Sequence, residues 1–276
     1  MAPLARSQVP SERPWLRSPE ETAVARDPEI VREMFDRVAR RYDLANHLLS
    51  FGCDFSWRRR AAEIVADWNP ACLLDLATGT GDLALVIQRK LPTVEVVGLD
   101  FSSAMLALAR RKGVHQLVTG DAAKLPLAHQ SFDVVTIAFG LRNIRDWGAA
   151  LREMQRVLTS AGHLLVLDFS LPQHPIWRSL HRFYLHRIMP FASELITRER
   201  KAYQYLGASI ENFPSGPAMC DLIETCGFRN AAAQPLTGGI VTIYTATKAG
   251  HPGRSRGIPQ CYPKDLAAKF LDLRSA

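Results

Sequence analysis

Cysteine is scarce in this chain of 276 residues, which contains five cysteines and no C-x-x-C pair. An odd number of cysteines without that spacing suggests neither a disulfide framework nor a zinc site. We therefore expect a protein of a reducing cytoplasm that uses no metal.

The sequence also lacks a membrane-spanning segment, since no apolar run approaches the roughly 18 residues that a bilayer crossing needs. Residues 1–21 have no apolar core of the kind found in a signal peptide. The net charge of +7 is mild and by itself fits nucleic acid, an anionic lipid surface or a solvated exterior. Its location is more informative, because the basic excess lies in 171–201 and 251–276, on either side of the expected core.

Composition divides the chain into one domain with two extensions. Residues 1–26 are rich in Pro, Ser, Glu and Arg without periodicity, and residues 249–276 form a basic tail. We expect the first segment to be disordered and the tail to be disordered or peripheral, which leaves 27–248 as the folded domain. Asp27-Pro28 predicts the start of N-terminal helices, because an N-cap acid is followed by Pro at the first helical position.

Strands and helices alternate from Cys72 onward. Apolar runs predict strands at 72–77, 94–100, 116–120, 132–139 and 163–169, with helices at 82–91, 103–112 and 147–158. The alternation predicts an α/β fold with a seven-stranded, mostly parallel, doubly wound Rossmann-like sheet. Gly238-Gly239 between two last β segments favours a hairpin and an antiparallel last strand. Residues 172–213 interrupt the alternation for too long to be a crossover, and we predict a helical lid there.

A glycine turn joins the first strand to a helix in LLDLATGTGDLA, residues 73–84. Gly79-x-Gly81-x-x-Ala84 satisfies the dinucleotide fingerprint, and Asp100 ends the next strand about 20 residues later, where an acid binds ribose hydroxyls. Taken alone, the turn fits either a nicotinamide dinucleotide or S-adenosylmethionine (SAM).

Three features favour SAM. Asp75 precedes the turn, where its carboxylate meets the cationic amino group of a methionine moiety and would repel a pyrophosphate. Asp121 follows the third strand, placed to accept a hydrogen bond from the adenine amino group, with Ala122 offering its backbone amide. The predicted terminal hairpin is the third feature, because class I methyltransferases end their sheet in this way. We expect Asp82 and Asp133 to be ordinary cap or turn residues.

One counter-signal is Tyr244-x-x-x-Lys248, the spacing of a short-chain dehydrogenase pair. On a strand these two residues lie roughly 13 Å apart, too far to cooperate as they would on a helix.

Beyond these residues, the sequence resembles the ubiquinone/menaquinone biosynthesis C-methyltransferase family, to which demethylmenaquinone methyltransferases belong. Its members are class I SAM-dependent enzymes that methylate a ring carbon of a prenylated quinol. The matching pieces span about 30–248, and their selective part is the combination of YDLANHLLSFG, FGLRN and YQYLGASI. The resemblance implies that SAM contacts Thr80, Asp100 and the Asp121-Ala122 pair. Asp121 stands where relatives often carry Asn, and His47 where they often carry an acid.

An Arg-Asn pair ends the apolar stretch FDVVTIAFGLRN, residues 132–143. Ligands in open α/β sheets sit outside the carboxyl ends of the strands, so Arg142 and Asn143 are predicted to face the reacting ring. Methylation of a ring carbon needs an ionised quinol hydroxyl, and a phenolic pKa of about 10 opposes ionisation at neutral pH. Arg142 would favour the anion, while Asn143 would orient the ring.

Arginine is a poor base, so we predict that the proton leaves through water, Tyr42 or Asp43. The alternative interpretation pairs Arg142 with an acid such as Asp146 and makes Asn143 the cap of the following helix.

Residues 176–191, IWRSLHRFYLHRIMPF, predict an amphipathic helix. This helix either packs on the domain or forms a prenyl groove that rests on lipid headgroups. Its apolar side is predicted to contain Ile176, Leu180, Phe183, Tyr184, Ile188 and Phe191, and its polar side Arg178, Ser179, His181, Arg182, His186 and Arg187. We expect His174, His181 and His186 to be solvated, because they lack acid or cysteine partners at ligand spacing.

The sequence therefore predicts a SAM-dependent C-methyltransferase of a prenylated quinol in respiratory or photosynthetic quinone biosynthesis. We expect a cytoplasmic protein in peripheral contact with the inner face of the membrane and without a nucleic-acid partner. Three alternatives stay open, namely a methyltransferase of another small phenol, a dehydrogenase, and a basic module that binds membrane surfaces or nucleic acid. The sequence does not distinguish a naphthoquinol from a benzoquinol, or a monomer from a homodimer.

Overall fold

The computed structural model describes residues 50–189 and 200–249, together with five residues nearer the N-terminus, which are Glu29, Arg32, Glu33, Asp36 and His47. The predicted N-terminal extension, the start of the helices at Asp27 and the tail beyond residue 249 lie outside the described residues.

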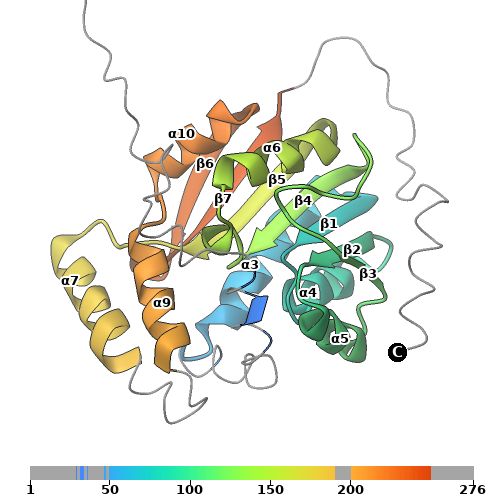
Figure 1. Cartoon of the computed structure of the whole chain (residues 1–276). Coiled ribbons are helices and arrows are strands. Elements are labelled where there is room, and N and C mark those ends of the chain that lie inside the picture. The colour runs from blue at the N-terminus through green and yellow to red at the C-terminus, as the bar shows by residue number, and fades with distance from the viewer. Residues whose placement is uncertain are drawn as a thin grey trace, which may run out of the picture.

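A seven-stranded sheet in the order β3-β2-β1-β4-β5-β7-β6 runs through the centre of the domain (Figure 1). Strands β1 to β5 pair in parallel, and β7 is antiparallel to both β5 and β6. The predicted mostly parallel sheet with an antiparallel last strand is therefore confirmed. The strands are β1 (Cys72–Leu76), β2 (Glu95–Asp100), β3 (Gln116–Thr119), β4 (Phe132–Ala138), β5 (Leu158–Phe169), β6 (Phe228–Leu236) and β7 (Val241–Lys248).

Helices cover both faces of the sheet (Figure 1). Neighbouring strand residues point to opposite faces, so Leu73 packs with side chains of α3 and α4, whereas Leu74 packs with those of α6 and α10. One face carries α3 (Cys53–Trp68), α4 (Asp82–Lys90) and α5 (Ser103–Lys112), and the other α6 (Trp147–Val157) and α10 (Pro217–Thr225).

The order of the strands reverses between β1 and β4, since β1 leads outward to β2 and β3 while β4 leads to β5. A reversal of this kind leaves a crevice outside the carboxyl ends of the two central strands. The glycine turn follows β1 and the Arg-Asn pair follows β4, so both predicted motifs border this crevice.

Tyr244 and Lys248 both lie on β7, as the sequence predicts. The Tyr244 hydroxyl accepts a hydrogen bond from the Gly216 backbone N–H at 2.9 Å, and Lys248 Nζ donates to the Leu158 carbonyl at 2.7 Å. Each side chain fixes a different loop to the strand.

In the described part of the predicted lid segment 172–213, two helices stand side by side beyond the carboxyl ends of the strands (Figure 1). These are α7 (Pro175–Phe183), which continues into a π-helical turn (Tyr184–Ile188), and α9 (Arg200–Glu211). The predicted division of the first helix into faces is wrong. His181, Leu185 and Met189 form its buried side, whereas Ile176, Leu180, Phe183 and Ile188 are exposed. The cluster beneath the helix, around Ile210, is too small to cover every apolar side chain.

Candidate active site

The glycine turn between β1 and α4 depends on left-handed backbone angles. Gly79 has a φ of 56° and Gly81 a φ of 82°, a region that side chains with a Cβ rarely adopt. A Cβ atom on Gly81 would lie 2.6 Å from Val114 Cγ2, so this glycine permits close packing of the turn on the segment after α5. A Cβ atom on Gly79 would meet nothing within 4 Å. The open space at Gly79 fits a ligand that approaches the backbone closely.

Asp100, at the end of β2, is tied directly to this turn. Its Oδ2 atom accepts a hydrogen bond from the Gly79 N–H at 2.8 Å, and its Oδ1 atom accepts one from the Ser102 N–H at 2.9 Å. Burial raises the pKa of Asp100 to about 6, although these two hydrogen bonds favour the charged form. The predicted ribose-binding acid is therefore held in place before any ligand arrives.

Asp75 is buried below the turn on β1. Its two oxygens accept hydrogen bonds from the hydroxyls of Thr78 and Thr136, both at 2.7 Å. Burial raises the pKa of Asp75 to about 6, and the nearby charge of Asp100 acts in the same direction. Within the described residues neither carboxylate forms an ion pair. The charge of Arg58 lowers the pKa of Asp75 without forming an ion pair with it, so the two buried acids fit a ligand that brings a positive charge.

The other predicted cofactor residues already have partners. The Thr80 hydroxyl accepts a hydrogen bond from Lys112 Nζ at 2.9 Å on the α5 side of the turn. Asp121 is exposed beyond β3, where its Oδ1 atom accepts from the Ala123 N–H at 2.8 Å. The structure thus brings Asp75, Gly79, Gly81 and Asp100 together, whereas the Thr80 hydroxyl and the Asp121 carboxylate hold local structure.

Arg142 follows β4 in a short 3-10 turn (Leu141–Asn143) and is buried. Its Nη1 atom donates to Asp168 Oδ1 at 2.7 Å and to the Phe139 carbonyl, and its guanidinium lies 5.1 Å from the centre of the Phe169 ring. The alternative that Arg142 pairs with an acid is confirmed, but the acid is Asp168 and not Asp146, because Asp146 caps α6 by accepting from the Ala149 N–H. Asn143 does not cap that helix, since its side-chain amide donates to the Phe139 carbonyl at 3.3 Å.

A cavity of about 780 Å³ opens beside Arg142 and Asn143. Its wall is mostly apolar and comes from α3, the ends of β4 and β5, the lid helices and the turn before β7. Among the described residues, two buried polar atoms on this wall lack a hydrogen-bond partner, namely Arg142 Nε and His181 Nε2. The prediction that His181 is solvated is wrong, because only 8% of this residue is exposed. Buried groups left unpaired in this way cost about 1–3 kcal/mol each, which favours a polar ligand in the cavity.

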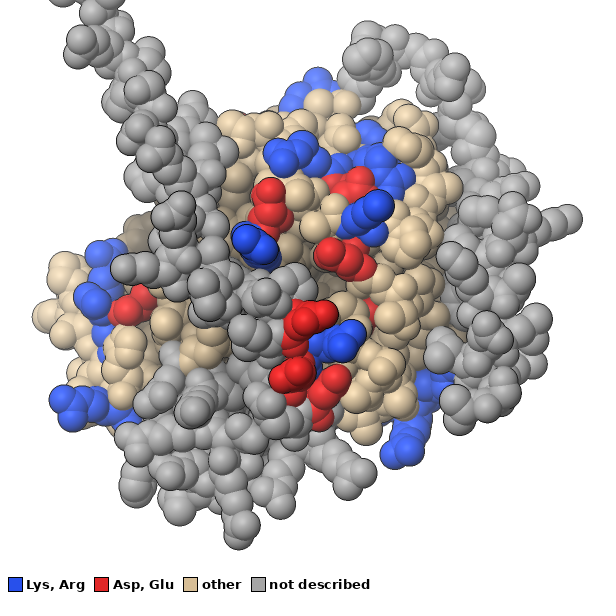
Figure 2. Space-filling model, viewed as in Figure 1, with Lys and Arg blue, Asp and Glu red and all other residues tan. Residues whose placement is uncertain are grey.

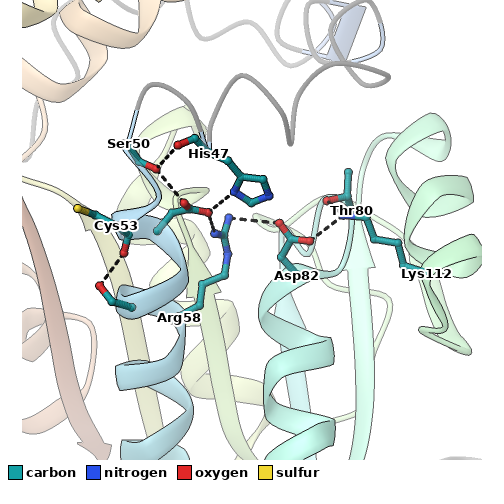
Figure 3. A network of polar contacts seen from close by, with 9 residues as sticks. His47, Ser50, Cys53, Arg58, Thr80, Asp82 and Lys112 are labelled. Atoms are coloured by element: carbon teal, nitrogen blue, oxygen red, sulfur yellow. Dashed lines mark hydrogen bonds and ion pairs between the residues drawn. The ribbon is translucent and has the colours of Figure 1, made fainter.

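A polar network links the cavity wall to the glycine turn (Figure 3). Arg58 of α3 pairs with Asp54 one turn earlier and lies 3.5 Å from Asp82 of α4, which in turn pairs with Lys112 at 2.7 Å. Asp54 also accepts from the Ser50 hydroxyl at 2.8 Å and lies 2.6 Å from His47 Nδ1. Burial alone would raise the pKa of Asp54, but the Ser50 hydrogen bond and the Arg58 charge lower it.

Sequence reasoning missed Asp54 and Arg58, whose spacing of four residues on a helix was the available signal. Asp133 is not a cap or turn residue as predicted, because it lies on β4, where its carboxylate accepts from the N–H groups of Ala71 and Cys72. Asp82 begins α4 as expected, but it also forms the two ion pairs of the network. The predicted proton acceptors Tyr42 and Asp43 lie outside the described residues.

Comparison with known proteins assigns this arrangement to a family. The model of the ubiE/COQ5 methyltransferase family matches residues 22–248. The demethylmenaquinone methyltransferase of Thermus thermophilus is 43% identical over 220 residues, which cover 78% of this chain and all of the relative. The ubiquinone/menaquinone biosynthesis C-methyltransferase UbiE of Syntrophotalea carbinolica is 43% identical over 223 residues, covering 79% of this chain and 94% of the relative.

A solved SAM-dependent methyltransferase of Thermotoga maritima, described as a possible histamine N-methyltransferase, matches with a TM-score of 0.55 at 19% identity. The alignment covers 78% of this chain and 99% of that one and supports the fold alone.

The chain belongs to the ubiE/COQ5 methyltransferase family. It is a SAM-dependent methyltransferase, which sets aside the dehydrogenase and the non-enzymatic binding module.

The two glycines of the turn should separate folding from cofactor binding. Gly81→Ala should lower the melting temperature markedly, because it adds a clash with Val114 to a left-handed backbone penalty of roughly 1–2 kcal/mol. Gly79→Ala carries the backbone penalty alone and should instead weaken binding of S-adenosylhomocysteine. Thermal unfolding and calorimetric titration of both variants test this pair, and equal losses of melting temperature would contradict the assignment.

The pKa of Asp75 predicts proton release when SAM binds. At pH 6 about half of the free protein should carry a protonated Asp75, because its pKa is about 6, and a bound ammonium group favours the ionised form. Titrations in two buffers that differ in ionisation enthalpy measure the protons released. Asp75→Asn should reduce that number, while Asp67→Asn, an exposed acid of α3, should not. An unchanged proton count in Asp75→Asn would show that this carboxylate does not meet the ammonium group.

Proposed function

We propose that this enzyme methylates a ring carbon of a prenylated quinol, the step that converts demethylmenaquinol to menaquinol or its equivalent for another quinol. The observation that carries the proposal is the guanidinium of Arg142, which Asp168 holds on the wall of a large, mostly apolar cavity. A prenylated quinol matches this cavity, because its hydroxyl can bind the Arg142 guanidinium and its apolar ring and chain can contact the apolar side chains of the wall. The second candidate substrate is a smaller phenol, because the polar groups of Arg142 and Asn143 could bind its hydroxyl without the apolar part of the cavity.

Arg142 acts by stabilising the ionised hydroxyl of the bound ring. Asp168 fixes the guanidinium through Nη1, so the positive charge of Arg142 stays at a defined place beside the cavity. A preorganised donor in surroundings of low dielectric stabilises an oxyanion more strongly than water does. Asn143, on the same wall, orients the ring with its amide.

The acids and the glycine turn hold SAM, which supplies the methyl group. Asp75 receives the ammonium group of its methionine moiety, and Asp100 receives the ribose hydroxyls. The Gly79–Gly81 backbone lies against the cofactor, with Thr80 beside it. Asp121 and Ala122 lie at the adenine end of the cofactor. The Asp121 carboxylate already accepts a hydrogen bond from the Ala123 N–H, so it would have to share or give up this bond to accept one from the adenine amino group.

The rim of the cavity supports peripheral contact with a membrane. Five exposed apolar side chains also line the cavity, and they are Phe51, Trp177, Leu180, Phe183 and Ile188. Apolar side chains gathered at an exposed rim mark an interaction site. Figure 2 shows blue basic side chains along the outer edge of the α7 region, whereas both signs alternate over the sheet. Within the described residues no helix is long and apolar enough to cross a bilayer. The rim lets a prenyl tail pass from lipid into the cavity.

Incubation of the purified protein with SAM and a reduced, demethylated quinol tests the function directly. Mass spectrometry should detect a product heavier by one methyl group, with the methyl on the ring carbon. Cells that lack the protein should accumulate the lighter quinone. Methylation of small phenols without methylation of any prenylated quinol would favour the second candidate substrate.

Changes at Arg142 should lower turnover without lowering affinity for SAM. Arg142→Lys keeps the charge but loses the fixed Nε–H, and we expect kcat to fall by about 10²-fold, the usual loss for one oxyanion donor. Arg142→Leu with Asp168→Asn removes both charges, so no buried carboxylate is left unpaired. Turnover near the wild-type value in both variants would show that the guanidinium takes no part in the reaction.

Liposome flotation tests the rim. Trp177→Ser with Phe183→Ser should reduce membrane binding by at least about tenfold, because each side chain loses part of the roughly 1.5–3 kcal/mol that full burial provides. Phe55→Ser is the matched control, since Phe55 is equally exposed but does not line the cavity. Binding that is equal in all three proteins, with or without anionic lipid, would contradict membrane contact through the rim.

A further inference from the structure

The cavity wall contains a buried histidine to which the proposed function gives no role. His181 lies on α7 and lines the cavity, and its Nε2 atom has no hydrogen-bond partner among the described residues. The residue shares the buried side of the lid helix with Leu185 and Met189, so the helix presents an imidazole where a purely apolar side chain would complete the packing.

His186, five residues further along the same segment, shows the contrast. Its Nε2 atom lies 3.1 Å from Glu211 Oε1, and its side chain is 46% exposed. The lid therefore carries one histidine with an acidic partner and solvent contact, and another that lines the cavity with its Nε2 atom buried and without a partner among the described residues.

Burial lowers the pKa of His181 below its ordinary value of 6.5, because desolvation disfavours the imidazolium form. At neutral pH the imidazole is therefore uncharged and carries one nitrogen lone pair. A neutral imidazole in a ligand cavity is suited to accept a proton from a bound hydroxyl.

The other titratable groups on the wall are less suited to this task. Arg142 has no basic lone pair, and Asp54 is held ionised by Ser50 and Arg58, which lower its pKa. Burial raises the pKa of Tyr184, so its hydroxyl stays protonated. The titratable and charged groups of the wall, besides His181, are Cys53, Asp54, Arg58, Arg142, Tyr184 and Tyr205. Arg182 and Glu211 pair with each other outside the cavity lining.

We propose that His181 accepts the proton of a ring hydroxyl of the bound quinol. This inference rests on the proposed function, because it requires a phenolic substrate in the cavity. The O–H bond breaks and an N–H bond forms on the imidazole, while Arg142 stabilises the resulting oxyanion. A bond then forms between the ring carbon and the methyl group as the S–CH3 bond of SAM breaks and S-adenosylhomocysteine leaves. The proton on that carbon leaves to water, and His181 returns its proton to the oxygen. The net change is one methyl group gained and one proton released.

Two variants of His181 and one control test the proposal. His181→Phe fills the same space without a base, and His181→Gln keeps a polar side chain that cannot take a proton. Both should lower kcat by about 10²-fold or more at pH 7, in keeping with general base catalysis. His186→Gln should stay within about twofold of the wild type. Binding of S-adenosylhomocysteine should be unchanged in all three.

The pH profile separates a base from a structural side chain. Wild-type kcat should rise through the lowered pKa of His181 and then level off. In His181→Gln it should keep rising toward the phenolic pKa of about 10, because hydroxide then supplies the ionised ring, and should approach the wild-type value there. A structural defect would lower kcat by the same factor at every pH.

Absorbance of bound 1-naphthol gives a readout that is independent of turnover. At pH 7 the wild type should hold a larger ionised fraction of the bound naphthol than either His181 variant does. Equal ionised fractions, or a pH profile in His181→Gln that parallels the wild type, would overturn the role of His181 while quinol methylation stands. Failure of the wild type to methylate any quinol would instead refute the proposed function.

Discussion

The buried ion pair between Arg142 and Asp168 sets the geometry of the site. Asp168, at the end of β5, accepts hydrogen bonds from Arg142 Nη1, the Arg142 backbone N–H and the Phe169 backbone N–H. These bonds fix the turn after β4 against the neighbouring strand and hold the guanidinium on the cavity wall. Removing one partner of such a pair typically costs about 3–5 kcal/mol, because the other charge is left buried and uncompensated. A permanent cation is therefore kept in apolar surroundings, and its side-chain hydrogen bonds to Asp168 and to the Phe139 carbonyl both use Nη1.

The carboxyl edge of the sheet combines two half-sites of opposite character. At β1 and β2, buried acids without an ion-pair partner among the described residues lie around a glycine turn, which fits a positively charged cofactor. At β4 and β5, a buried cation lies on the wall of an apolar cavity, which fits a ring that develops negative charge. Arg58 connects the halves, since it pairs with Asp54 on the cavity wall and approaches Asp82 beside the turn (Figure 3). The charges of the two half-sites thus match the two reactants of a methyl transfer from a sulfonium to a phenolate.

The sheet and the glycine turn could be predicted because their signals are local. Apolar runs, a glycine-rich turn and an acid at the next strand end are visible within about 30 residues, the length of one βαβ unit. The partner of Arg142 could not be predicted in the same way. Asp146 is near in sequence, whereas Asp168 lies on the next strand and meets Arg142 only through the parallel pairing of β4 with β5. The position of His181 was mispredicted because a count of apolar residues does not reveal which side of a helix has a partner to pack against. Tyr42 and Asp43 stay predictions.

The account rests on the claim that the quinol hydroxyl binds at Arg142 and is ionised there. The most direct test is a crystal structure of the protein with S-adenosylhomocysteine and a short-chain reduced naphthoquinol. We expect a ring oxygen about 2.7–3.1 Å from a guanidinium nitrogen of Arg142, with the reacting carbon facing the sulfur and the prenyl chain leaving over the rim at Phe183. A ring bound with both oxygens away from Arg142, or outside the cavity, would contradict it.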